Sequence, residues 1–306
     1  MRLLPNTDLS GISLGTERMW LDGSAAALRS GRRAYPYRPG YELVGRVAAV
    51  GPAFADAAVG SRVFAMKPHG SHALLQRRDS WVALPETLGD EDAVAVALTA
   101  TALHAVHRSA MTVGDGAVVA GLGTLGFILL QVLAASFAGP VIALTGTAEK
   151  AALALRHGAS AVLTYDDLPA MRASLPPIQT VFECSGAAAN VARVASLARS
   201  QGEIVLAGFY NEPIALDGET LFDRELTLKG VRAAGAHVSG GDYNRWDRRR
   251  NLALATTLVA AGKVRAHALV THRFPAARFA DAYRLIADRA ESRAAIQICL
   301  DWREAA

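Results

Sequence analysis

The stretch from Gly116 to Ala148 has no charged residue, and it is the feature that most constrains how this chain can fold. Glycines and the pair Gly139-Pro140 interrupt it. No run therefore reaches the roughly 20 unbroken apolar residues that a membrane-spanning helix needs. Two short β-branched runs flank one apolar run of helical spacing. The stretch is predicted to be a buried strand, helix and strand, in a protein without a membrane span.

The glycines lie where the first strand meets the helix. Residues 116–120 (GAVVA) run into residues 121–126 (GLGTLG), and an apolar helix is expected to continue from Phe127. In a G-x-G-x-x-G turn, the first glycine permits the tight turn, the second lets the backbone approach a pyrophosphate, and the third allows close packing of the helix. A purely structural turn is the alternative, but the order of strand, turn and helix favours a dinucleotide site. The expected cofactor contacts here are Gly121, Gly123, Thr124, Leu125 and Gly126.

The end of the second strand bears on the choice between NAD and NADP. An Asp or Glu there would bind the ribose 2′-hydroxyl of NAD, but residues 143–147 read ALTGT. Thr145, Thr147 and Lys150 are expected to contact a 2′-phosphate instead. Lys150 as an ordinary charge on a helix surface is the alternative. We therefore predict NADP as cofactor and leave NAD open.

Two different patterns of predicted secondary structure divide the chain. From about Leu88 onward, β-branched runs alternate with alanine-rich helical runs, which is typical of a doubly wound parallel sheet. Earlier strand-like segments, such as residues 41–50, 62–66 and 71–82, are separated by Gly and Pro turns. Near the C-terminus, residues 295–300 are predicted to form a strand that returns to the first domain. The α/β chain should thus have a β-rich domain (1–88 and 271–306) and a doubly wound domain (89–270).

Composition excludes several classes of protein. The only cysteines, Cys184 and Cys299, are far apart, so neither a disulfide framework nor a thiolate metal cluster can form. Residues 1–14 have no apolar segment of signal-peptide length, and we expect a cytoplasmic protein. The net charge is only +4. The basic cluster at residues 245–250 is interpreted as a solvated helix start, so no nucleic-acid partner is predicted. We expect a small-molecule substrate and a homodimer.

Four stretches in order resemble the medium-chain dehydrogenase/reductase superfamily. They are residues 10–17 (SGISLGTE), residues 39–45 (PGYELVG), the glycine turn, and residues 202–208 (GEIVLAG). The resemblance implies a GroES-like β domain beside a Rossmann domain, with substrate and nicotinamide meeting in the cleft between them. It also implies cofactor contacts at Gly208 and Phe209. Relatives usually carry roughly thirty more residues before the SGI run, so the GroES-like domain is expected to be shortened.

Departures from the family pattern concern the metal. Zinc-binding members have a Cys after the SGI run, a His before the Glu of PGHE, and a Cys or Glu ahead of the cofactor domain. The matching positions here are Ser13, Tyr41 and Ala97. Since a catalytic zinc needs three protein ligands, the comparison predicts an enzyme without zinc. The family's four-cysteine structural lobe is also missing.

Without zinc, another group must stabilise or protonate the alkoxide that develops during hydride transfer. Tyr41 can donate a hydrogen bond, although a pKa near 10 makes an ordinary tyrosine a poor acid; a core tyrosine is the alternative. His69 and His72 are candidates for a proton relay, because histidine is the side chain whose unperturbed pKa lies near neutrality. Ser13 and Glu17 belong to the loop that lines the cleft in relatives, with a turn-forming serine and a solvated glutamate as alternatives.

Three functions remain open. Residues 203–213 (EIVLAGFYNEP) and 299–303 (CLDWR) resemble the branch of bacteriochlorophyllide a dehydrogenases, which oxidise a hydroxyethyl group on the pigment to an acetyl. Residues 231–250 do not match that branch, so a sister enzyme acting on another alcohol or carbonyl is equally compatible. The leading hypothesis is a zinc-independent enzyme that interconverts a secondary alcohol and a ketone. The alternatives are an NADPH-dependent enone or quinone reductase and a catalytically inactive cofactor-binding homologue.

Overall fold

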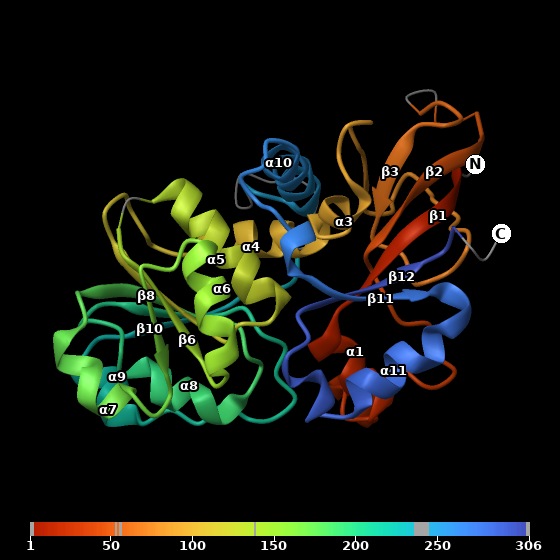
Figure 1. Ribbon diagram of the computed structural model, residues 1–306. Coiled ribbons are helices and arrows are strands. Elements are labelled where there is room, and N and C mark those ends of the chain that lie inside the picture. Colours follow the sequence, from red (N-terminus) through yellow and green to blue (C-terminus); the bar gives the residue numbers. More distant parts are fainter. Residues whose placement is uncertain (1–2, 53, 55–56, 138, 236–244, 304–306) are drawn as a thin grey trace. The chain divides into compact units, whose positions relative to one another are not determined.

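The computed structural model describes residues 3–52, 54, 57–137, 139–235 and 245–303 (Figure 1). The chain forms two compact units, residues 1–100 with 237–306, and residues 101–236. Helix α4 (Val96–Arg108) contains the boundary between them. The boundaries expected after residues 88 and 270 stay predictions, since the compact units are defined by packing alone.

The first unit contains a six-stranded sheet in the order β11-β12-β1-β2-β3-β4. All neighbouring strands are antiparallel except β11 and β12. The C-terminal strand β12 pairs with β1, from Leu9 opposite Asp301 to Ile12 opposite Ile298, which confirms the predicted return of this strand. The strands are β1 (Leu3–Ile12), β2 (Leu43–Val50), β3 (Arg62–Ala65), β4 (Trp81–Ala83), β11 (Val270–Pro275) and β12 (Gln297–Asp301).

Five α-helices of the described residues belong to the first unit. They are α1 (Leu14–Leu21), α2 (Ala26–Arg29), α3 (Asp90–Ala93), α10 (Arg248–Ala260) and α11 (Phe279–Ala287). Asp247 caps α10 by accepting a hydrogen bond from the Arg250 amide at 2.8 Å. Arg249 and Arg250 are exposed, so the basic cluster is a solvated helix start, as predicted. One core cluster packs Leu43, Val47 and Phe54 together, and another packs Ile12 against Ile286.

The second unit contains a parallel six-stranded sheet in the order β10-β9-β8-β5-β6-β7 (Figure 1). The chain moves outward from β5 in one direction and then from β8 in the other, so the sheet is doubly wound and its switch point lies between β5 and β8. The strands are β5 (Gly116–Ala120), β6 (Val141–Thr145), β7 (Ala161–Thr164), β8 (Ile178–Glu183), β9 (Glu203–Leu206) and β10 (Thr227–Gly230).

The uncharged stretch forms β5, α5 (Thr124–Ser136) and β6, which confirms the predicted strand, helix and strand. Helix α5 packs against both of these strands. The other α-helices of this unit are α6 (Ala151–Arg156), α7 (Leu168–Met171), α8 (Ala188–Ala195) and α9 (Gly218–Asp223). The short 3₁₀ helices of the chain are Ala148–Lys150, Arg172–Ser174, His267–Leu269, Ala276–Arg278 and Glu291–Arg293. Among the described residues, none of the helices combines the length and apolar character needed to cross a membrane.

Candidate active site

The glycine turn after β5 has the geometry that a dinucleotide needs. Gly121 has a φ of +96°, and a Cβ there would lie 2.7 Å from the Ser185 amide nitrogen. A Cβ at Gly126 would lie 2.1 Å from the Gly121 carbonyl oxygen. At Gly123, the N-cap of α5, a Cβ would meet nothing within 4 Å. The first and third glycines are therefore required by packing, while the second leaves open space beside a helix N-terminus, where a pyrophosphate fits.

Other predicted cofactor residues lie at the carboxyl edge of the same sheet. Thr145 ends β6, and the Gly208 amide, beyond β9, donates to the Glu183 carbonyl at 2.9 Å. Thr147 donates its amide to Thr145 Oγ1 at 3.0 Å. Phe209 is half exposed. Because the carboxyl ends of parallel strands meet at one edge of the sheet, these segments share that edge with the glycine turn.

Lys150 lies at the glycine turn and not on an exposed helix surface. Its Nζ donates a hydrogen bond to the Leu122 carbonyl at 3.1 Å, inside the turn itself. Burial lowers the pKa of this ammonium. The side chain thus puts a positive charge beside the segment expected to hold phosphate.

Glu183 is a buried acid at the end of β8 that was not predicted as a site residue. Its carboxylate accepts hydrogen bonds from the amides of Ser185 and Gly186, at 3.2 and 3.3 Å, and from the Tyr210 hydroxyl. Burial raises the pKa of Glu183. The bonds hold the Ser185 turn against Gly121, so Glu183 shapes the cofactor edge. The sequence signal that could have identified Glu183 is the presence of an acid within the otherwise largely apolar run 178–184.

Tyr41 and Ser13 meet in the first unit. The Tyr41 hydroxyl, just before β2, donates to Ser13 Oγ at 2.7 Å, at the N-cap of α1. Ser13 Oγ in turn donates to Thr16 Oγ1 at 3.3 Å. Burial, and then the neighbouring Glu42 carboxyl, raise the pKa of Tyr41. Tyr41 is therefore a protonated phenol that begins a chain of three hydroxyls.

Glu17 is buried, with 1% of its side chain exposed, so the alternative of a solvated glutamate is wrong. It lies on α1, a helix where a loop was expected. Its carboxylate accepts hydrogen bonds from the Ser13 amide at 2.9 Å, from His69 Nε2 at 3.1 Å, and from the Tyr283 hydroxyl. Three donors converging on one carboxylate are the arrangement that satisfies an ionised acid.

Both ring nitrogens of His69 are engaged. Nε2 faces Glu17, and Nδ1 lies 2.9 Å from Ser10 Oγ, which also accepts a hydrogen bond from Trp302 Nε1 at 2.8 Å. His72 is placed differently, because it is exposed and its ring contacts Ser71 Oγ at 3.0 Å. The structure thus gathers Ser13, Glu17, Tyr41 and His69 into one cluster and leaves His72 outside it. Ser10, Tyr283 and Trp302, which no sequence signal singled out, complete the cluster.

Two motif glycines make room for polar side chains of this cluster. A Cβ at Gly40, whose φ is +95°, would lie 2.6 Å from the His69 ring. A Cβ at Gly11 would lie 2.2 Å from Glu42 Oε2. Glu42 itself is fully buried, and its Oε2 accepts a long hydrogen bond from Gln297 Nε2 at 3.5 Å. Burial, reinforced by the charge of Glu17, raises the pKa of Glu42 well above its ordinary value. The neutral, protonated form of Glu42 is therefore favoured in this position.

The positions that match the zinc ligands of relatives carry Ser13, Tyr41 and Ala97. Ser13 and Tyr41 are hydrogen-bonded to each other, and Ala97 is buried on α4. These side chains offer a zinc ion no thiolate, imidazole or carboxylate. Within the described ranges, no group of three or more His, Cys, Asp or Glu side chains is placed to hold a metal ion.

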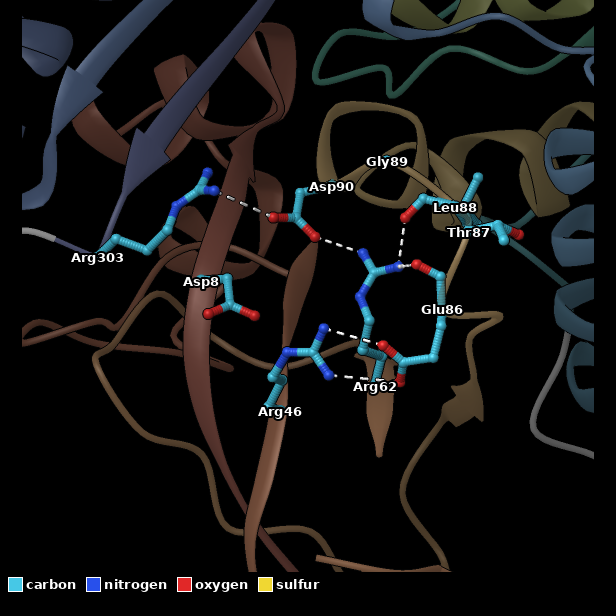
Figure 2. Close-up of a pocket in the computed structure, with 9 residues that line it drawn as sticks. All are labelled: Asp8, Arg46, Arg62, Glu86, Thr87, Leu88, Gly89, Asp90 and Arg303. Atoms are coloured by element: carbon cyan, nitrogen blue, oxygen red, sulfur yellow. Dashed lines mark hydrogen bonds and ion pairs between the residues drawn. The ribbon is translucent and has the colours of Figure 1, made fainter. Parts of the chain in front are cut away.

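A charged cavity of about 370 Å³ also lies in the first unit (Figure 2). Figure 2 shows that its three arginines pair with acids of the same cavity. Arg46 pairs with Glu86 at 2.9 Å, while Arg62 and Arg303 both pair with Asp90. Arg62 also donates to the Leu88 carbonyl. With its arginines satisfied by its own acids, this cavity is a structural feature and not a ligand site.

Comparison with known proteins agrees with this architecture. The zinc-binding dehydrogenase family matches residues 124–247. The 2-desacetyl-2-hydroxyethyl bacteriochlorophyllide A dehydrogenase of Rhodobacter capsulatus is 27% identical, over 97% of this chain and 88% of that protein. The structure of Escherichia coli galactitol-1-phosphate dehydrogenase superposes with a TM-score of 0.82 at 20% identity, over 98% of this chain and 92% of that one. A Sinorhizobium meliloti structure described as a zinc-binding dehydrogenase bound to NADP gives a TM-score of 0.81 at 22% identity, over the same two fractions.

The Rossmann unit, the GroES-like β unit and these relatives define an NAD(P)-dependent dehydrogenase or reductase that acts on a CH–OH or C=O group. The family match over residues 124–247, the bacteriochlorophyllide dehydrogenase relatives and the shared fold make the chain similar to the zinc-type alcohol dehydrogenases of the medium-chain dehydrogenase/reductase superfamily.

Proposed function

We propose that this chain is a zinc-independent oxidoreductase that interconverts a secondary alcohol and a ketone, with NADP as its cofactor. The hydrogen bond between Tyr41 and Ser13 is the observation that carries the proposal. It joins two positions where zinc-binding relatives have metal ligands. A neutral phenol there is a preorganised hydrogen-bond donor for a developing alkoxide.

The proposed proton path follows the hydroxyl chain. The hydrogen bonds run outward from Tyr41, which is the direction of alcohol oxidation: the Tyr41 hydroxyl oxygen takes the alcohol proton as its own proton passes to Ser13 Oγ, the Ser13 proton passes to Thr16 Oγ1, and the Thr16 proton leaves to solvent. The reduction of a ketone reverses these transfers once the three hydroxyls have turned, with solvent supplying the proton. Bound NADP would supply or accept the hydride. Because the pKa of Tyr41 is raised, the phenol should move a proton only in concert with hydride transfer.

Glu17 and His69 are proposed to position this chain. The Ser13 amide is fixed by the Glu17 carboxylate, which His69 holds in turn. Among the described residues, no hydrogen bond joins His69 directly to the three hydroxyls, so proton exchange between them and His69 would need a bridging water. Both histidines stay in the proposal, with His69 inside the cluster and His72 outside it, exposed to solvent.

The proposed NADP preference rests on the glycine turn after β5 and on the residues that follow β6. Gly123 leaves room for a pyrophosphate, and Lys150 lies beside the turn where a 2′-phosphate would add negative charge. No acid follows β6 directly at residues 146–148 to claim a ribose 2′-hydroxyl. A cytoplasmic location belongs to the same proposal, since Cys184 and Cys299 are free thiols. A homodimer stays a prediction.

The substrate class is proposed from the Rhodobacter relative, whose name specifies a hydroxyethyl side chain. An aryl hydroxyethyl or acetyl group is therefore the first chemistry to test. The test is reduction of acetophenone and oxidation of 1-phenylethanol, with products identified by chromatography. Tyr41→Phe should lower turnover roughly a hundredfold, the usual effect of losing one transition-state hydrogen bond, and should leave NADPH affinity unchanged.

Tyr165→Phe is the matched control, because it makes the same change in the second unit and should retain activity. Equal turnover by wild type and Tyr41→Phe would remove the proposed role of Tyr41. Saturation of an enone without reduction of the ketone would establish the reductase alternative. Tight NADPH binding without turnover on any carbonyl would indicate an inactive homologue.

A further inference from the structure

A second hollow of the first unit, about 580 Å³ in volume, carries unbalanced positive charge. Arg32, Arg33 and Arg38 line it together with Tyr37, Gly40 and Pro68, and none of its lining residues is acidic. The cavity of Figure 2 also has three arginines, but each has an acid within it. A cluster of guanidinium groups without carboxylates is a recognition site for an anionic ligand.

The three arginines keep their donors available. Among the described residues, these three guanidinium groups have one hydrogen-bond partner, Ser30 Oγ, which lies 3.0 Å from Arg32 Nε. No ion pair between described residues involves them. All three are exposed, so mutual repulsion is weakened by solvent but not cancelled by a protein acid.

Contacts with Trp20 and Ala27 hold the segment that carries the three arginines in place. The Tyr37 ring stacks on Trp20 with centroids 3.8 Å apart, and the Tyr35 hydroxyl donates to the Trp20 carbonyl. The Arg33 amide donates to the Ala27 carbonyl at 2.9 Å. Fixing the backbone in advance reduces the entropy lost when the side chains close on a ligand.

The hollow adjoins the Tyr41 cluster. Gly40 directly precedes Tyr41, and Pro68 directly precedes His69, whose amide donates to the Pro39 carbonyl at 2.9 Å. The His69 ring packs against Gly40. Tyr37 is close enough to Glu17 for that carboxylate to raise its pKa, after burial as the larger cause. An anion in the hollow would therefore belong to the same molecule that presents its reacting group to Tyr41.

We propose that Arg32, Arg33 and Arg38 select substrates that carry an anionic group, a carboxylate or a phosphate, on the molecule that is oxidised or reduced. The proposal deepens the proposed function and rests on it for the location of the reacting group. The aromatic pair Trp20 and Tyr37 suits a planar substrate body beside that anion.

Binding of ketones to the full chain saturated with NADP⁺ tests the proposal, because no hydride is available and no turnover occurs. Calorimetry compares 4-acetylbenzoate with its uncharged methyl ester. The acid should bind roughly tenfold more tightly, as expected for two or three exposed charge pairs, and 0.5 M KCl should remove much of that preference. The double variant Arg33→Gln/Arg38→Gln should lose the preference, while the affinity for the ester stays the same.

Arg78→Gln is the matched control, since it removes one exposed guanidinium of the same unit outside the hollow. 4-Acetylphenyl phosphate separates the two anions, because tighter binding than the benzoate identifies a phosphate ligand and weaker binding a carboxylate. Equal affinity of wild type for acid and ester would overturn the proposal. The proposal would also be overturned if Arg78→Gln lost the preference for the acid as fully as the double variant, or if the double variant lost affinity for NADPH. These binding measurements do not depend on turnover or on Tyr41→Phe. The proposed role of Tyr41 and the proposed anion selectivity can therefore fail independently of each other.

Discussion

The buried carboxyl of Glu42 should make the first unit less stable as pH rises, and Glu42→Gln should remove this dependence. Glu42 is fully buried, its pKa is raised well above 4.5, and its Oε1 has no hydrogen-bond partner within the described part of the chain. The native state therefore holds a proton that the unfolded state has released. Above pH 4.5 the free energy of unfolding falls by about 1.4 kcal/mol per pH unit, until the native pKa is reached.

The assay is urea unfolding at pH 5, 6 and 7, followed by tryptophan fluorescence. All four tryptophans (Trp20, Trp81, Trp246 and Trp302) belong to the first unit, so the signal reports on the unit that contains Glu42. Glu42→Gln keeps the shape of the side chain, and the stability it adds should grow with pH by up to about 1.4 kcal/mol per pH unit, until the native pKa of Glu42 is reached.

Glu149→Gln, the loss of an exposed acid in the second unit, is the control and should leave the slope unchanged. Parallel curves for wild type and Glu42→Gln would show that Glu42 is ionised in the native protein, and the reasoning from its burial would be refuted.

Three further predictions concern the cofactor, the metal and the proton path. Lys150→Ala should reduce the preference for NADPH over NADH severalfold in titrations, because it removes the charge beside the turn; unchanged affinities for both would contradict the NADP assignment. Purified protein should contain no stoichiometric zinc, and chelators should leave activity unchanged; elemental analysis that finds one zinc per chain would show otherwise. His69→Ala should shift the pH profile of turnover. His72→Ala should shift it only if the His72 side chain exchanges protons between the site and solvent. Wild-type pH profiles for both variants would exclude a histidine relay.

The sequence predicted those features that depend on local chemistry. The glycine turn was recognisable because strand, turn and helix follow one another directly, and each glycine serves the contact expected of its position. The returning strand β12 was recognisable as a short apolar run. In contrast, β1 contains Pro5, Asn6 and Asp8 and has low strand propensity; its pairing with β2 and β12 on either side makes it a strand.

The candidate site was predictable only in part, because its electrostatics arise from distant segments. Glu17 was expected in a loop, either as a cleft residue or as a solvated glutamate, but its partners His69 and Tyr283 come from far along the chain and bury it. Glu42 was overlooked for the same reason, since only its surroundings make it neutral. Lys150 folds back on Leu122, a contact that a count of charges cannot reveal.

The two motif glycines of the first unit impose an order on how this site can evolve. Gly11 can acquire a side chain only after Glu42 has been shortened and Gln297 and Val94 have given way, and Gly40 only after His69 has been replaced and the backbone has left its left-handed conformation. Each substitution is therefore harmful alone and neutral only on a changed background. Descendants of this sequence should accordingly retain Gly11 with Glu42 and Gly40 with His69 as inherited pairs, even where their substrates diverge.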